Sequence, residues 1–180
     1  MEWACINIEA APPLFAMLQK NRPRSFNFNF GLSNVDGVQR FKHARSPRVA
    51  AFGNGSFEHS AEHLASLRDE GCEFEEFDVR TITWRSFVEL TSLERVDLMV
   101  LDVEGHEAAV LEGMTGCAVL PDVLCIEVGH SNFPVLREML LILGYTYDTS
   151  SHVNAYFVKT ALMPLFAQRA LQRQLVATPG

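Results

Sequence analysis

The stretch Val96–Glu107, V-D-L-M-V-L-D-V-E-G-H-E, carries the clearest information about the fold. Its first part, Val96–Val103, is an apolar run of the kind that forms a buried strand. Gly105 permits a tight turn after that strand, and the apolar residues of Glu107–Met114 are spaced for one face of a helix. The stretch therefore predicts a strand, a turn and a helix in direct succession, which is a repeating unit of α/β sheets.

Strands and helices alternate on both sides of this unit. Further strands are expected at Trp3–Ile8, Ser25–Phe30, Val38–Phe41, Phe74–Trp84 and Val123–Val128. Further helices are expected at Pro12–Asn21, Ala61–Leu67 and Ser86–Leu90, and from a cap at Asn132 to Gly144. An antiparallel pair, Tyr145–Tyr147 with Val153–Val158, and an amphipathic helix, Ala161–Leu175, complete the series. This order predicts an α/β fold with a doubly wound, mostly parallel sheet and a C-terminal antiparallel hairpin. Residues 1–160 are expected to form one domain, and residues 161–180 a C-terminal helical tail.

The composition excludes some classes of protein. The chain has 180 residues, of which 48% are hydrophobic, and this is enough to bury a core. Its net charge of -7 argues against nucleic acid as the main partner, because phosphate binding needs a surplus of lysine and arginine. No apolar run approaches the roughly 20 residues that cross a bilayer, and the first residues do not read as a secretion signal. We therefore expect no membrane partner and a cytoplasmic location.

The four cysteines support the same location. Cys5, Cys72, Cys117 and Cys125 form no C-x-x-C pair and have no zinc-finger spacing. Cys5 and Cys125 lie inside apolar runs, where a thiol usually behaves as a small core residue. We expect reduced cysteines, as in an intracellular protein, and no cysteine-bound metal.

Acidic residues follow three of the expected strands: Glu9, then Asp102 with Glu104, then Glu127. In doubly wound sheets, ligands bind at the carboxyl ends of the strands. Glu9 is suited either to hold two ribose hydroxyls or to favour the positive end of the following helix, and its spacing does not separate the two roles. If the strand persists to Glu104, Asp102 and Glu104 point the same way, and either is suited to hold a cation or a polar ligand group. Ordinary helix capping explains Glu107 better than it explains these two acids.

Histidines provide candidate proton acceptors. His106 and His130 each follow a strand at the same rim, and imidazole titrates near neutrality. A solvated loop histidine is the alternative for each of them. His59 and His63 are spaced for one face of a helix and could bind a metal there, but no third ligand of suitable spacing is apparent. We therefore expect these two to be surface residues, and no metal site.

The stretch Val96–Glu107 resembles the signature of FkbM-type methyltransferases, in which an apolar strand runs into I-D-V-E-G-x-E. Weaker similarities occur in the same order as in the family. Ile8–Pro12 resembles the family's E-P-x-P helix start, Leu18–Asn21 its L-x-x-N helix end, and Gly31–Asn34 with Gly37 its A-L-S-x-x-x-G. Asp122–Glu127 resembles the family's next strand, and Leu136–Tyr145 its late helix and turn. The resemblance covers roughly Ile6 to Lys159, and its Asp-Val-Glu-Gly-x-Glu core is fairly specific.

The resemblance implies a Rossmann-like, class I methyltransferase sheet and S-adenosylmethionine as cofactor. It implies that Glu9 holds the ribose, that Leu32 and Ser33 lie beside the adenine, and that Asp102 lies near the methionine end or the acceptor. The acceptor would be a hydroxyl group of a small molecule or carbohydrate.

The resemblance also implies an in-line transfer of a methyl group from sulfonium to oxygen, in which the protein aligns the two partners and excludes water. Glu104, His106 and His130 are the candidate bases that would take the hydroxyl proton.

The chain departs from the family at one place. The family has a strand, a Gly-rich loop D-x-G-x-x-x-G and a helix before the element that begins at Trp3, and the sequence does not contain them. We therefore expect a sheet that lacks the first strand and helix. Two alternatives stay open: a methyltransferase-fold remnant with impaired catalysis, and another nucleotide-binding α/β module. The acceptor, which would depend on loops such as Lys42–Gly71, and the oligomeric state are not predicted.

Overall fold

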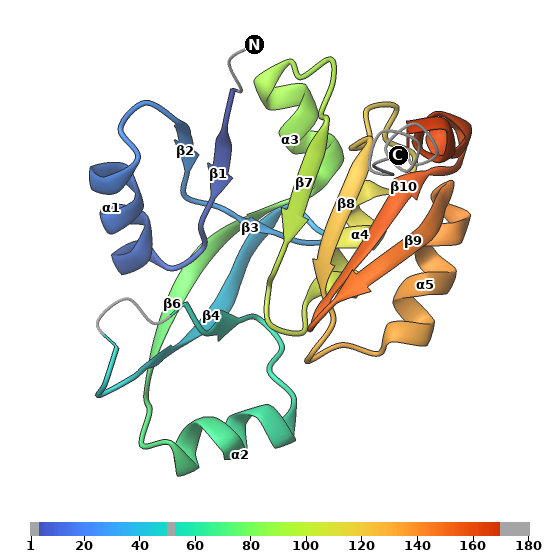
Figure 1. The fold of residues 1–180 in the computed structure, drawn as a ribbon. Coiled ribbons are helices and arrows are strands. Elements are labelled where there is room, and N and C mark those ends of the chain that lie inside the picture. Colours follow the sequence, from blue (N-terminus) through green and yellow to red (C-terminus); the bar gives the residue numbers. More distant parts are fainter. Residues whose placement is uncertain (1–3, 50–52, 170–180) are drawn as a thin grey trace, which may run out of the picture.

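The computed structural model describes residues 4–49 and 53–169 (Figure 1). Its strands form three sheets. The first is a parallel pair of β1 (Ile6–Ile8) and β2 (Phe26–Phe28). The second has the order β3 (Gly31–Leu32), β6 (Glu73–Ile82), β4 (Gly37–Arg45) and β5 (Gly55–Ser56). The third has the order β7 (Leu98–Leu101), β8 (Val123–Glu127), β10 (Asn154–Lys159) and β9 (Tyr145–Ser151).

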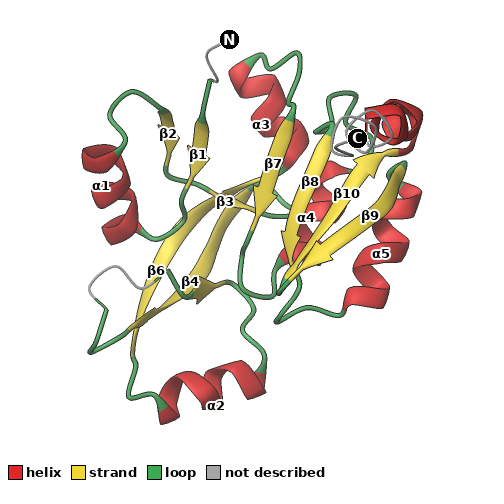
Figure 2. Cartoon of the chain, in the orientation of Figure 1, coloured by secondary structure: helices red, strands yellow, loops and turns green. Residues whose placement is uncertain are grey.

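In the described part of the chain, five α-helices with both ends described accompany these strands (Figure 2). They are α1 (Pro12–Asn21), α2 (Ala61–Asp69), α3 (Trp84–Thr91), α4 (Glu107–Met114) and α5 (Phe133–Ile142). Three of them begin at a side-chain cap, in which Ser60, Thr83 or Asn132 accepts a hydrogen bond from a backbone N–H of the first turn. A 3₁₀ turn, η1 (Thr160–Leu162), leads into helical residues 163–169. The rest of the expected tail helix lies outside the described residues.

The prediction of an α/β fold is confirmed, but a mostly parallel sheet is not. In the described part of the chain, β1–β2, β3–β6 and β7–β8 are parallel, whereas β4–β5, β4–β6, β8–β10 and β9–β10 are antiparallel. The longest ladder runs from Gly37 opposite Thr81 to Arg45 opposite Glu73, and it is antiparallel. The two four-stranded sheets are therefore mixed, the second because β4 folds back along β6 and the third because β10 and β9 add antiparallel strands to β7 and β8. The C-terminal hairpin of β9 and β10 is confirmed.

The main core lies between the β7–β8–β10–β9 sheet and helices α3, α4 and α5. Its fully buried side chains include Phe87, Leu111, Leu124, Leu140 and Phe157. A second, smaller apolar cluster of Ala11, Phe41 and Val79 joins the start of α1 to the β3–β6–β4–β5 sheet. The helices of the described ranges include none that is long and apolar enough to cross a membrane.

The cysteine predictions are partly confirmed. Cys125 is buried on β8, as its apolar run predicts, and none of the four cysteines is in a disulfide. The prediction for Cys5 is wrong, because this residue precedes the short strand β1 and is exposed.

A glycine on α4 sets how closely this helix approaches the end of β3. A Cβ atom added to Gly113 would lie 2.2 Å from the backbone oxygen of Ser33, which is closer than real Cβ contacts. We expect Gly113→Ala to lower the free energy of unfolding by about 1–3 kcal/mol through overpacking, although alanine is ordinarily the better helix former. Urea unfolding followed by circular dichroism would measure this change.

Gly37→Ala is the matched control, because nothing lies within 4 Å of a Cβ atom added at that position. A Gly113→Ala variant that is as stable as the parent, or more so, would contradict the close contact between α4 and Ser33.

Candidate active site

Three strands from two sheets run in the same direction and end on the same side of the molecule, which we call the rim. The arrows of β1, β7 and β8 point the same way and end at the lower edge of their sheets in Figure 1. The parallel register pairs Leu101 of β7 with Ile126 of β8. Asp102 follows β7 and Glu127 is the last residue of β8, so the two acids lie at neighbouring strand ends, close enough for the charge of Asp102 to act on Glu127. Glu9 is the residue that follows β1, in the separate β1–β2 sheet.

The two neighbouring carboxylates titrate away from their ordinary ranges. Burial raises the pKa of Asp102, and the charge of Glu107 raises it further. Burial is also the main cause that raises the pKa of Glu127, and the N–H of Gly129, which donates to Glu127 Oε1 at 2.8 Å, acts in the opposite direction. Glu127 Oε2 is buried and has no hydrogen-bond partner among the described residues. Negative charge is therefore concentrated here, and protein donors neutralise it only in part.

Glu104 does not continue the strand, so the condition under which it would point the same way as Asp102 is not met. Strand β7 ends at Leu101, and Glu104 lies in a turn with a left-handed backbone, at φ 53°. The following residue, Gly105, has φ 99°. A left-handed glutamate is uncommon and is held by its surroundings, and such residues are often found at functional sites.

The pKa of Glu104 is raised to about 7. The largest cause is burial, followed by the charges of Asp102, Glu127 and Glu107. A carboxylate with this pKa can take up and release a proton near neutral pH.

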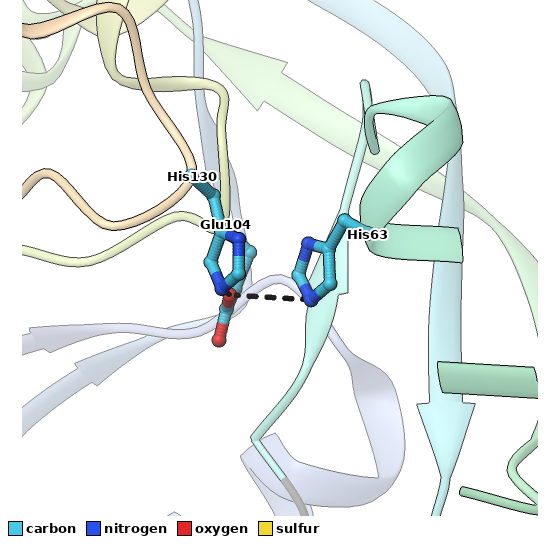
Figure 3. A group of neighbouring side chains, drawn as sticks. All are labelled: His63, Glu104 and His130. Atoms are coloured by element: carbon cyan, nitrogen blue, oxygen red, sulfur yellow. Dashed lines mark ion pairs between the residues drawn. The ribbon is translucent and has the colours of Figure 1, made fainter. Parts of the chain in front are cut away.

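Two histidines face this carboxylate, as Figure 3 shows. His130, in the loop after β8, has its Nε2 3.6 Å from Glu104 Oε2. His63, on α2, has its Nε2 3.9 Å from the same oxygen. The two imidazole rings are stacked, with centroids 3.7 Å apart and planes within 4°. The side chain of His130 is 39% exposed, whereas that of His63 is 5% exposed.

The prediction that His59 and His63 are surface residues on one helix is wrong. His59 precedes the cap Ser60 and therefore lies outside α2, and its ring nitrogens are buried. His63 is buried on the inner face of α2, together with Leu67. Burial lowers the pKa of both histidines, and that of His59 falls to about 4. His59 is therefore neutral at physiological pH.

Sequence reasoning missed His63 as a member of the site. Its segment was expected to form a short helix, but which side of that helix faces the rim depends on how the helix packs against the rest of the protein. The available signal was the spacing of His63 with Leu67, which puts a polar ring on the apolar side of a helix. Ser56 fixes the docking, because its hydroxyl donates to Val103 O at 3.2 Å and accepts from Glu58 N at 3.1 Å.

Glu107 supports the turn from beneath. It is 0% exposed, and its Oε1 accepts hydrogen bonds from the backbone N–H groups of Val103, at 3.1 Å, and Gly105, at 3.3 Å. Its Oε2 accepts from the Ser131 hydroxyl, in the loop that also carries His130. One buried carboxylate thus ties together the two loops that hold Glu104 and His130.

His106, expected as a possible base, lies beneath the surface and is 3% exposed. Its Nε2 is 3.0 Å from Ser33 Oγ, and its Nδ1 is 3.7 Å from Glu58 Oε2. Its ring also packs against Phe57, with centroids 5.1 Å apart. Burial lowers its pKa. These contacts join α4 to the end of β3 and to the loop before α2, which is a structural position.

The remaining candidates for cofactor binding lie apart from this group in the chain. Glu9 is half-buried at the end of β1, its Oε1 accepts from Ala11 N at 2.8 Å, and burial raises its pKa. Leu32 and Ser33 are both buried, and Ser33, at 0% exposure, is enclosed by His106 and α4.

Comparison with known protein families identifies a match. The family model described as the Methyltransferase FkbM domain matches residues 1–147, which is most of the chain. No curated protein and no solved structure matches significantly.

Proposed function

The chain belongs to the FkbM methyltransferase family, and from this membership we propose that it transfers the methyl group of S-adenosylmethionine to a hydroxyl oxygen of a small molecule or carbohydrate. The observation that carries the proposal is the group formed by Asp102, Glu104, Glu127 and His130 at the ends of β7 and β8. This group combines negative charge with a proton acceptor that works near neutrality.

The residues of the rim fit the cofactor in two respects. The sulfonium and ammonium groups of S-adenosylmethionine are both positive, and the carboxylates at the ends of β7 and β8 attract positive charge. Glu9 provides a carboxylate at the end of β1, where a ribose diol can donate hydrogen bonds to it. Leu32 and Ser33 are buried, and their contact with the adenine stays a prediction. When bound, S-adenosylmethionine supplies an electrophilic methyl group.

The protein's own residues would handle the acceptor. As the new oxygen–carbon bond forms, the hydroxyl proton must leave, and Glu104 is the group whose pKa suits its capture. His130 is more exposed and lies 3.6 Å from Glu104, so it can pass that proton to water. His106 is not assigned this role, because Ser33 and Phe57 enclose it.

A methylation assay tests the proposal. The full chain is incubated with S-adenosylmethionine and a panel of glycosides and phenols, and mass spectrometry detects methylated products. We expect methylation of at least one hydroxyl compound and calorimetric binding of the cofactor. Absence of both would support a remnant with impaired catalysis, and a thermal shift with NAD or ATP alone would support another nucleotide-binding module.

Glu9 provides a specific prediction for cofactor binding. Hydrogen bonds to a charged group contribute about 1.5–3 kcal/mol, so Glu9→Gln should weaken binding of S-adenosylmethionine by roughly 10-fold to 100-fold. Isothermal titration calorimetry would measure the dissociation constant. Glu138→Gln, on the exposed side of α5, is the matched control and should bind as the parent does. Equal affinity in all three proteins would remove Glu9 from the cofactor site.

A further inference from the structure

Three segments that are distant in the sequence bring metal-ligating side chains to one point. His63 comes from α2, Glu104 from the turn after β7, and His130 from the loop after β8 (Figure 3). Their donor atoms, two imidazole nitrogens and one carboxylate oxygen, all lie within 4.8 Å of one another. This convergence depends on tertiary structure, because 66 residues lie between His63 and His130 in the chain.

We propose that His63, Glu104 and His130 bind a divalent transition-metal ion of the zinc type. The inference goes beyond methyl transfer, because ion binding at this point requires neither S-adenosylmethionine nor an acceptor. Two imidazoles and one carboxylate are a common donor set for zinc, and three protein ligands leave the fourth position of a tetrahedral site open.

The distances are close to those of a bound site. Zinc bonds of about 2.0–2.1 Å in a tetrahedral arrangement place neighbouring donors about 3.3 Å apart. Here Glu104 Oε2 is 3.6 Å from His130 Nε2 and 3.9 Å from His63 Nε2. The stacked rings must turn out of their parallel arrangement to direct both nitrogen lone pairs at one ion. His130 can make this movement, because its side chain is 39% exposed.

The surroundings favour a cation. Asp102 and Glu107 lie close enough to Glu104 to act on it electrostatically, and so does Glu127. Carboxylates that crowd together repel one another, and a divalent cation among them offsets this repulsion. The deeper ligand, His63, is held on a helix whose N-terminus is capped by Ser60.

The neighbouring ring adds a second observation. Both nitrogens of His59 and Nδ1 of His63 are buried, and they have no hydrogen-bond partner among the described residues. The His59 ring lies 5.1 Å from the His63 ring, in an edge-to-face arrangement. A buried polar atom without a partner needs an explanation, and a nearby water molecule or ion is one of them.

The ligand types distinguish between classes of ion. Imidazole nitrogen suits zinc, copper, nickel and iron, whereas magnesium and calcium prefer sites made of oxygen. A magnesium site would draw on the carboxylates of the rim alone and would not need His63. The proposal therefore commits to the two histidines as ligands.

Calorimetry of the chelator-treated full chain with zinc chloride, without cofactor, tests the site. The Cys5→Ser background is used, because an exposed thiol also binds zinc. We expect one zinc ion per chain, with a dissociation constant below about 10 µM. Magnesium should bind at least about 100-fold more weakly, and Co²⁺ should give the visible absorption of a four-coordinate ion.

Two variants assign the ligands. His130→Ala changes a partly exposed side chain and should weaken zinc binding by at least about tenfold, and Glu104→Gln should do the same. His152→Asn, on the exposed turn between β9 and β10, is the control and should bind zinc as the parent does. Circular dichroism verifies that each variant is folded.

Unchanged zinc affinity in folded His130→Ala, or absence of zinc binding to the parent, would overturn the site. Methyl transfer is assayed separately, with chelator present, so the two proposals can fail independently. Zinc binding without any methylation would count against the proposed function and leave the metal site standing.

Discussion

Replacement of Glu107 by alanine is expected to lower the free energy of unfolding by about 3–5 kcal/mol. Glu107 is completely buried, and it accepts hydrogen bonds from Val103 N, Gly105 N and the Ser131 hydroxyl. Alanine would leave these donors without their partner and would open a cavity beneath the turn. Urea unfolding at constant pH would measure the loss.

Two further variants separate this effect from a general sensitivity of α4. Glu112→Ala changes an exposed carboxylate of the same helix and should cost less than about 1 kcal/mol. Glu107→Gln keeps an acceptor oxygen for the two backbone groups and should recover part of the lost stability. If Glu107→Ala were as stable as Glu112→Ala, the buried carboxylate would not be what holds the turn.

Replacement of Glu104 by glutamine is expected to have opposite effects on stability and activity. The pKa of Glu104 is about 7 in the folded protein and 4.5 in a free side chain. The folded protein therefore holds this proton more tightly than the unfolded chain does. The stability that this provides is complete below pH 4.5 and is lost as the pH rises through 7, and the loss amounts to about 3 kcal/mol.

Glutamine does not titrate, so Glu104→Gln should escape this loss. Relative to the parent, we expect the variant to gain about 3 kcal/mol of stability between pH 4.5 and pH 8. Methyl transfer should fall by roughly 100-fold or more, as is typical when a general base is removed. Unfolding is measured across this pH range in the presence of a chelator. Parallel stability curves for variant and parent would show that Glu104 does not hold an elevated pKa.

Local features of the fold could be predicted from the sequence. Helix α4 begins at Glu107 and ends at Met114, as its apolar spacing predicts, and α5 begins after the cap Asn132. Strand β8 spans Val123–Glu127, within one residue of the expected range. These elements follow from patterns of neighbouring residues, which a sequence displays directly.

Features that depend on distant contacts could not be predicted in the same way. Strand β7 was expected to reach Val103, but it ends at Leu101. The reason is that the N–H of Val103 donates to the side chain of Glu107 and does not extend the ladder. Strand direction in the second sheet likewise depends on β4 folding back along β6.

The candidate site shows the same division. Glu104 and His130 could be named from their positions after strands, and the structure brings them within 3.6 Å of each other. His63 could not, because its approach to the rim requires α2 to dock through the loop that contains Ser56. The roles of all three residues stay predictions until they are measured.

The two apolar clusters have a consequence for how this protein can diverge. Phe41 and Val79 pack in the small cluster, whereas the side chains that anchor β7 and β8 belong to the large one. Substitutions at sites without shared partners have additive effects on stability. The region that carries α2 can therefore accumulate mutations and change which side chains reach the rim at little cost to the scaffold beneath Glu104, provided that Ser56 keeps its contact with Val103 and Phe57 its contact with His106.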